Sequence, residues 1–196
     1  MKTYFIAPFS TITKKSTRMY WIYSRVKGEK KVYFTAPKSK DDEFTFVGMA
    51  DHQTFADATE RGFVKIASEN PDFIVSAGDM LENGKLKNWQ ENFFQKMPIL
   101  QGFPFAACEG NNDAGLNLFQ SFLALDNRYY SFTYGNTRFV VLDSNLTFNE
   151  GSEQIEWLEN TLKEIAQITG YNLNTVKSRL YAGLKKLKNI VGEDVQ

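Results

Sequence analysis

The amino-acid sequence predicts an α/β fold followed by a small all-α tail. Short apolar runs alternate with stretches whose apolar residues recur at helical spacing, which is typical of an α/β layer. The chain has 196 residues, of which 42% are hydrophobic, so it is long enough to bury a core. Near the C-terminus, two stretches with helical periodicity flank Gly170, which indicates a pair of helices joined by a turn.

The N-terminal segment, residues 1–43, predicts a β-hairpin and a linker. Residues 18–26 and 31–36 are rich in aromatic and β-branched side chains, and they flank a turn at Gly28. The polar stretch that follows, 37–43, is expected to form the linker.

Predicted strands and helices alternate through residues 44–160. The expected strands are Phe44–Ala50, Phe73–Ala77, Phe105–Cys108, Tyr129–Tyr134 and Thr137–Asp143, of which the last two form a hairpin. The expected helices are Thr54–Asn70, Leu86–Met97, Leu116–Leu125 and one that begins after a Ser152 cap. Proline lacks the N–H that a helix interior needs, so Pro98 is expected to end the second helix.

Composition excludes several classes of protein. The single cysteine, Cys108, rules out an internal disulfide framework and a cysteine-built zinc finger. The single histidine, His52, rules out any metal site built from several histidines. No apolar run reaches the roughly 18 residues of a membrane span. The N-terminus is a poor signal peptide, which favours a cytoplasmic protein over an exported one.

The formal net charge of zero is the sum of three unlike segments. Residues 1–40 carry ten basic and one acidic side chain, residues 41–162 carry seven and 19, and residues 163–196 carry six and three. These changes of sign suggest segment boundaries, although solvated faces of a single domain would give the same pattern.

Polar residues follow three of the predicted strands, where each strand ends. Asp51 and Gln53 follow the first strand, Asp79 the second and Asn111 the third. Taken singly, each of these residues is more often part of a turn or a helix cap. Together they lie at adjacent strand ends, and their oxygen atoms would suit divalent metal ions. Asp79 could bridge a pair of ions that clamps a phosphoryl group.

Residues 44–160 resemble the first half of a calcineurin-like metallophosphoesterase, closest to the branch of the purple acid phosphatases. The motifs that carry the resemblance are Asp51-x-Gln53, PDFIVSAGDMLENG at 71–84, GNND at 110–113, YYSFTYGNTRFVVLDSN at 129–145 and EQIEWLENTL at 153–162. The resemblance implies part of that family's β-sandwich layer with flanking helices, and hydrolysis of phosphate esters with two divalent ions drawn from Mn, Fe or Zn.

The resemblance also implies a role for each matched residue. Asp51 would bind the first metal, Asp79 would bridge, and Asn111 would bind the second. Gln53 stands where many relatives have a histidine ligand. Asn112 stands at the position of a catalytic histidine that assists the leaving group, but an asparagine can only donate a hydrogen bond and cannot act as a general acid.

The chain departs from the family in its histidines. The family takes further metal ligands from histidines in its second half, and this chain has none after His52. On an extended strand end, His52 points away from Asp51 and Gln53, so it is expected to be structural or solvent-exposed. The predicted two-metal site is therefore incomplete.

The tail, residues 161–196, predicts a helix-turn-helix. Ala166, Gly170 and Val176 have the spacing of the DNA-binding form, and Asn172 or Asn174 can cap the second helix. The residues expected to face bases and phosphates are Asn174, Thr175, Lys177, Ser178 and Arg179. An amphipathic basic helix lying on its own domain fits the pattern equally well.

The stretch EIAQITGYNLNTVKSRLYAGLKKLK resembles the C-terminal promoter-recognition region of bacterial sigma factors. The resemblance implies promoter DNA and RNA polymerase as partners, although the sigma region that binds the polymerase core is absent. Three functions are therefore open: a metal-dependent phosphoesterase domain fused to a DNA-binding tail, a promoter-recognition module alone, or an inactive chimeric remnant with its seam near 160–164.

Overall fold

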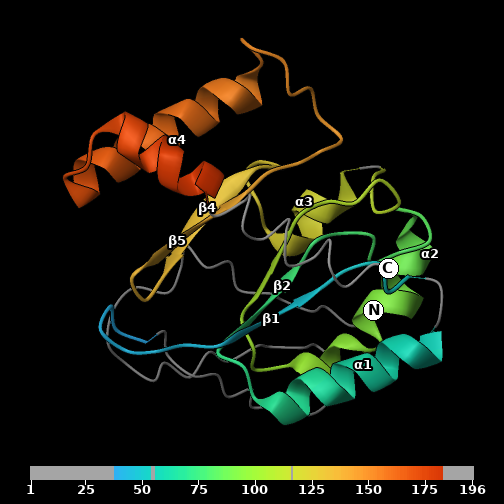
Figure 1. Cartoon of the computed structure of the whole chain (residues 1–196). Coiled ribbons are helices and arrows are strands. Elements are labelled where there is room, and N and C mark those ends of the chain that lie inside the picture. The colour runs from blue at the N-terminus through green and yellow to red at the C-terminus, as the bar shows by residue number, and fades with distance from the viewer. Residues whose placement is uncertain (1–37, 54–55, 116, 183–196) are drawn as a thin grey trace, which may run out of the picture. The chain divides into compact units, whose positions relative to one another are not determined.

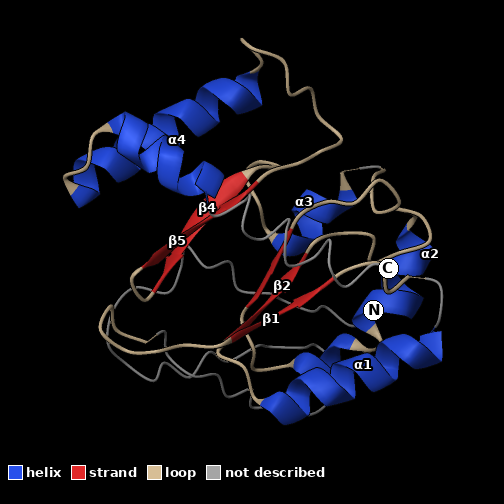
Figure 2. Cartoon of the chain, viewed as in Figure 1, coloured by secondary structure: helices blue, strands red, loops and turns tan. Residues whose placement is uncertain are grey.

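The computed structural model describes residues 38–53, 56–115 and 117–182. The chain divides into two compact units, Met1–Asn145 and Leu146–Gln196. Figure 1 and Figure 2 show the elements of each unit.

Some predicted features fall outside the described residues. They are the hairpin expected at 18–36 and the lysines that follow residue 182. Within the described part of the chain, no helix combines the length and the hydrophobicity that crossing a membrane requires.

The first unit is organised around a parallel three-stranded sheet. Its strands, β1 (Phe46–Met49), β2 (Phe73–Ser76) and β3 (Phe105–Ala107), lie in the order β1-β2-β3. All three predicted strands are confirmed, each one to three residues shorter than expected. Because the strands are parallel, their carboxyl ends meet at one edge of the sheet (Figure 2).

Helices cover one face of this sheet. They are α1 (Ala56–Glu69), α2 (Leu86–Asn88), the π-helix η2 (Trp89–Phe94), the 3-10 helix η3 (Met97–Leu100) and α3 (Leu118–Leu123). Their buried side chains form one apolar core with Ile74 of β2 and Phe105 of β3, and Trp89, Phe93 and Phe119 are fully buried in it. This face supplies most of the apolar burial of the unit.

The sequence predicts one continuous helix over Leu86–Met97, and this prediction is wrong about the type of helix. The chain there passes from a short α-helix into a π-helix and then into the 3-10 helix η3. Pro98 does not end the helical run. It lies in the first turn of η3, where its missing N–H has no partner to lose.

The other face of the sheet packs against a hairpin. Strands β4 (Tyr130–Tyr134) and β5 (Thr137–Val141) are antiparallel, and Gly135 turns between them at φ +57°. Phe73 of β2 meets the hairpin through Tyr134 and Phe139, with ring centroids 4.7 and 5.2 Å apart. The hairpin and the sheet therefore form two layers, and the predicted α/β class is confirmed.

At the outer edge of β3, a side chain occupies the backbone groups of Ala107. The Tyr130 hydroxyl accepts a hydrogen bond from the Ala107 N–H (2.9 Å) and donates one to the Ala107 carbonyl (2.8 Å). Burial raises the pKa of Tyr130 to about 12, so the hydroxyl keeps its proton at neutral pH.

The described part of the second unit, residues 146–182, contains two helices. The first, α4 (Glu153–Thr169), begins directly after Ser152, which is its N-cap residue as predicted, although the Ser152 side chain makes no capping hydrogen bond. Glu153 and Glu156 instead place negative charge in the first turn, which favours the positive end of the helix dipole. The helix runs unbroken across the boundary expected at 160/161.

A turn joins α4 to the second helix, whose described residues are 173–182. Gly170 ends α4 at φ +71°, as its position in the sequence predicts. Of the two asparagines expected as a cap, Asn172 is the one used, because its Oδ1 accepts the Thr175 N–H at 2.8 Å.

Candidate functional site

The segments that follow β1, β2 and β3 are tied together by backbone hydrogen bonds. The N–H of Asp51 donates to the Gly78 carbonyl (3.2 Å), and the N–H of Cys108 donates to the Ser76 carbonyl (3.0 Å). Three strand ends that are far apart in the sequence therefore lie side by side, as the sequence predicts.

Two glycines bring the second and third of these segments into close contact. A Cβ on Gly78 would lie 2.6 Å from the Gly110 nitrogen, and one on Gly110 would lie 2.1 Å from Asp79 Oδ1. No side chain fits at either position. Asp79 itself adopts a left-handed conformation, with φ +51°, which is uncommon for a residue other than glycine.

The carboxylate of Asp79 is held by Asn112. The Asn112 backbone N–H donates to Asp79 Oδ1, and the Asn112 side-chain Nδ2 donates to Asp79 Oδ2, each at 3.0 Å. The structure thus brings these two predicted site residues together, but it places Asn112 against a predicted metal ligand.

Asp113 fixes the two segments to each other. Its side chain is fully buried and accepts three backbone N–H groups, from Met80 (2.8 Å), Leu81 (2.9 Å) and Gly110 (3.0 Å). Burial raises the pKa of Asp113, and the three donors oppose that rise. Sequence reasoning gave this residue no role, although it lies in the GNND motif.

A cluster of charged side chains includes Glu109, which follows β3. The Arg128 Nε lies 2.5 Å from Glu109 Oε2 and 2.5 Å from Asp143 Oδ2, and both acids are buried. Asn145 Nδ2 donates to the Glu109 carbonyl and to Asp143 Oδ1, each at 2.9 Å. Burial raises the pKa of Glu109, while the Arg128 guanidinium lowers it. The sequence gave no signal for this cluster.

The remaining predicted ligands have different environments. Asp51 is exposed and has φ +51°, and Asn111 is exposed in the GNND turn. Gln53 is half-buried, and its Oε1 is a buried atom that has no hydrogen-bond partner among the described residues.

His52 has a different environment. Its ring packs edge-to-face on Phe63 with centroids 5.5 Å apart, and its backbone carbonyl accepts the Thr59 hydroxyl. Burial lowers the pKa of His52, and Lys96 adds to that effect. A neutral ring packed on the core supports the structural role that the sequence predicts.

The donor types at this edge would suit a divalent ion. Asp51, Gln53, Asp79 and Asn111 offer carboxylate and amide oxygens, which hard cations prefer, and the partnerless Oε1 of Gln53 is one of them. Within the described residues, no group of three or more His, Cys, Asp or Glu is placed to hold a metal.

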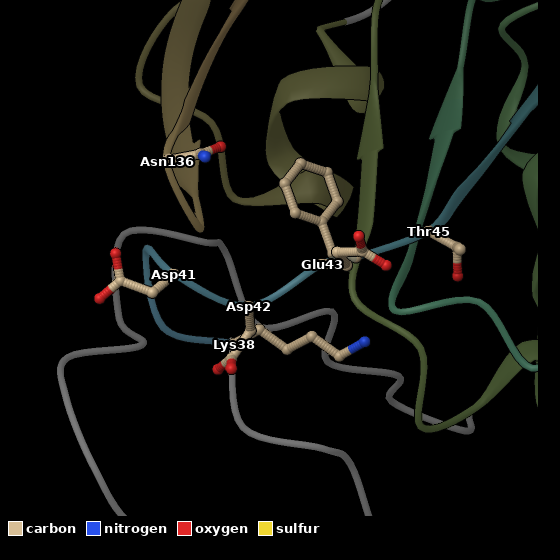
Figure 3. A pocket seen from close by; sticks show the side chains of 7 residues that line it. Lys38, Asp41, Asp42, Glu43, Thr45 and Asn136 are labelled. Carbon is tan, nitrogen blue, oxygen red and sulfur yellow. The ribbon is translucent and has the colours of Figure 1, made fainter.

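A separate hollow of about 480 Å³ lies away from the strand ends (Figure 3). Its lining residues are Lys38, Asp41, Asp42, Glu43, Phe44, Thr45 and Asn136. Phe44 and Thr45 precede β1, and Asn136 lies in the turn between β4 and β5. This hollow is thus near the amino end of β1, and it contains none of the predicted ligands.

Most of the predicted DNA-facing side chains make contacts inside the second unit. Thr175 is part of the Asn172 cap, and the Ser178 hydroxyl donates to the Thr175 carbonyl at 3.0 Å. Lys177 Nζ lies 3.6 Å from Glu159 Oε1, and Arg179 stacks 4.0 Å from the centre of the Tyr171 ring. Asn174 is exposed.

Comparison with known proteins finds similarity to purple acid phosphatases. The chain is 39% identical to "Probable purple acid phosphatase 20" of Arabidopsis thaliana over 118 residues, which are 60% of this chain and 24% of that protein. It is 28% identical to "Probable inactive purple acid phosphatase 24" of the same plant over 121 residues, 50% of this chain and 20% of that protein. The chain thus spans about a quarter or less of the length of these relatives.

A solved structure shares the fold. Purple acid phosphatase PPD1 from yellow lupin (Lupinus luteus) seeds superposes with a TM-score of 0.57 at 17% identity, over 69% of this chain and 30% of that one. The model of the calcineurin-like phosphoesterase family matches residues 44–193. That range includes most of the tail, so the comparisons give the sigma-factor resemblance no support. Since the match covers most of the sequence, the chain belongs to the calcineurin-like phosphoesterase family.

Proposed function

We propose that this chain is a metal-dependent phosphoesterase domain that binds one divalent ion at the carboxyl ends of β1, β2 and β3. Asp79 is the central ligand, and Asp51, Gln53 and Asn111 complete the oxygen donors. The observation that carries the proposal is the close contact between the segments after β2 and β3, which holds the Asp79 carboxylate at this edge.

The charge of the site supports a cation. Asp79 and the buried acids Glu109, Asp113 and Asp143 surround this edge, and Arg128 is the cation that pairs with two of them. The net negative charge favours a divalent ion. A bound ion would polarise a phosphoryl oxygen and lower the pKa of a bound water. The purple acid phosphatase names of the relatives support a phosphate ester as the substrate.

Hydrolysis of p-nitrophenyl phosphate tests the proposal. We expect Mn²⁺, Fe²⁺ or Zn²⁺ to stimulate release of p-nitrophenol, and Asp79→Asn to lower the stimulated rate by about tenfold or more, because a charged ligand is lost. Asp41→Asn, an exposed acid in the separate hollow, is the matched control and should keep the wild-type rate. Failure of all three metals to stimulate turnover would contradict the proposal.

DNA binding by the second unit is a second candidate function. The observation that favours it is a pair of helices joined at Gly170 and capped by Asn172, which is the arrangement of a helix-turn-helix. Asn174, Ser178 and Arg179 are exposed on the second helix.

Fluorescence anisotropy with a labelled promoter-like duplex tests this candidate. We expect affinity to fall steeply as salt rises and Arg179→Ala to weaken binding, because phosphate contacts release counterions. Lys163→Ala, on α4, should change the affinity less. Binding that ignores both salt and Arg179 would exclude the candidate.

A further inference from the structure

We propose that Asn112 is a positioning residue that fixes the Asp79 carboxylate for a divalent ion. The inference rests on the proposed function, because it concerns the ligand at the centre of that site. Asn112 stands where the family's motif has a histidine that assists the leaving group. In this chain its two donors point to Asp79, with one hydrogen bond to each carboxylate oxygen.

The geometry leaves the carboxylate little freedom. The two hydrogen bonds, each 3.0 Å long, engage Oδ1 and Oδ2 separately, so rotation of the carboxylate would break at least one of them. The backbone of Gly110 closes another side, since even a Cβ there would lie 2.1 Å from Oδ1. Each carboxylate oxygen has two lone pairs, and among the described residues Asn112 uses one on each.

Asp113 holds Asn112 and Asp79 in place relative to each other. Asp113 Oδ2 accepts the Gly110 N–H at 3.0 Å, which closes the turn that carries Asn112. Asp113 Oδ1 accepts the N–H groups of Met80 and Leu81, immediately after Asp79. The segments that carry Asn112 and Asp79 are therefore both bound to the buried carboxylate of Asp113. The relative position of Asn112 and Asp79 is thus set before any ion binds.

An amide suits this task because it carries no charge. It donates hydrogen bonds to a carboxylate without neutralising it and without repelling a cation, whereas a protonated histidine at the same place would do both. An amide also cannot deliver a proton near neutral pH. Asn112 therefore acts on the proposed metal ligand Asp79, and not on the leaving group of the substrate.

Titration calorimetry of the full chain with Mn²⁺ tests the inference. We expect Asn112→Ala to bind Mn²⁺ about tenfold more weakly than the wild type, because groups that orient metal ligands typically contribute that much or more to affinity. The matched control is Asn92→Ala, which removes a half-buried amide that donates to Asn88 Oδ1 at 2.7 Å in the helical layer. Asn92→Ala should bind as the wild type does.

Two further measurements separate positioning from general stability. Urea unfolding without metal should give Asn112→Ala and Asn92→Ala similar midpoints, since each loses one amide hydrogen bond. In ¹H–¹⁵N spectra of the wild type, Zn²⁺ should shift the side-chain amide signals of Asn112 and leave those of Asn92 in place.

The outcomes distinguish this inference from the proposed function. If the wild type binds Mn²⁺ and Asn112→Ala binds it equally well, the positioning role is overturned and the proposed site stands. If the wild type and Asp79→Asn bind Mn²⁺ equally, or neither binds it, the proposed site is overturned together with the role of Asn112.

Discussion

Replacing Arg128 with alanine is expected to destabilise the fold by about 3–5 kcal/mol at neutral pH, the cost of breaking a buried ion pair from one side. The guanidinium lies 2.5 Å from oxygens of Glu109 and Asp143, and the variant leaves both acids buried without it. Urea unfolding followed by circular dichroism measures the loss. Arg138→Ala is the control: Arg138 is exposed and donates to Thr133 and Ser131, and its loss should change stability by less than about 0.5 kcal/mol.

The deficit of Arg128→Ala should depend on pH. Burial already raises the pKa of Glu109, and loss of the guanidinium, which lowers it, would raise it further. A carboxyl whose pKa is higher in the folded chain stabilises the fold below its unfolded pKa, and that stabilisation is lost as pH rises through the folded pKa. The deficit should therefore be smaller near pH ~4 than at neutral pH. A deficit that is equal at both would contradict this account.

Replacing Asp113 with alanine is expected to cost about 3–5 kcal/mol, which approaches the total stability of a small domain. The buried carboxylate accepts the N–H groups of Met80, Leu81 and Gly110, and alanine would leave all three without an acceptor. Asp113→Asn keeps one acceptor oxygen and should lose less. Chemical unfolding gives the size of both effects.

Hydrogen exchange locates the effect of Asp113. We expect the amides of Met80, Leu81 and Gly110 to exchange faster in Asp113→Asn, because their acceptor is weakened. Asp126→Ala, which removes an exposed acid from the loop before β4, should change neither exchange nor stability. Unchanged protection at the three amides would show that Asp113 does not hold the two segments together.

The strands of the parallel sheet were predictable because each appears in the sequence as a short, continuous apolar run. β2 and β3 are buried as such runs predict, whereas the residues of β1 are exposed or half-buried. The helical run after β2 was predictable only as helical. Trp89, Phe93 and Phe94 pack on the core at a spacing that fits an α-helix and a π-helix alike, so periodicity could not choose between them.

The ends of the predicted strands indicated where the candidate site lies, but not which contacts hold its residues in place. Asp51, Asp79 and Asn111 could be placed together because parallel strands end at one edge. Arg128 and its partners Glu109 and Asp143 meet only through the folded chain, and no local pattern marks such contacts. For the same reason, the sequence placed Asn112 at the position of a catalytic histidine but gave no sign of its hydrogen bonds to Asp79.

The hydroxyl of Tyr130 also determines how this sheet can associate with other chains. An edge strand with free N–H and C=O groups is a template for aggregation or for an added strand. At β3 the outward-facing groups of Ala107 are already taken by Tyr130, whose high pKa keeps its proton in place. An incoming strand would have to displace that side chain, so the Tyr130 hydroxyl protects this end of β3 from self-association of the sheet.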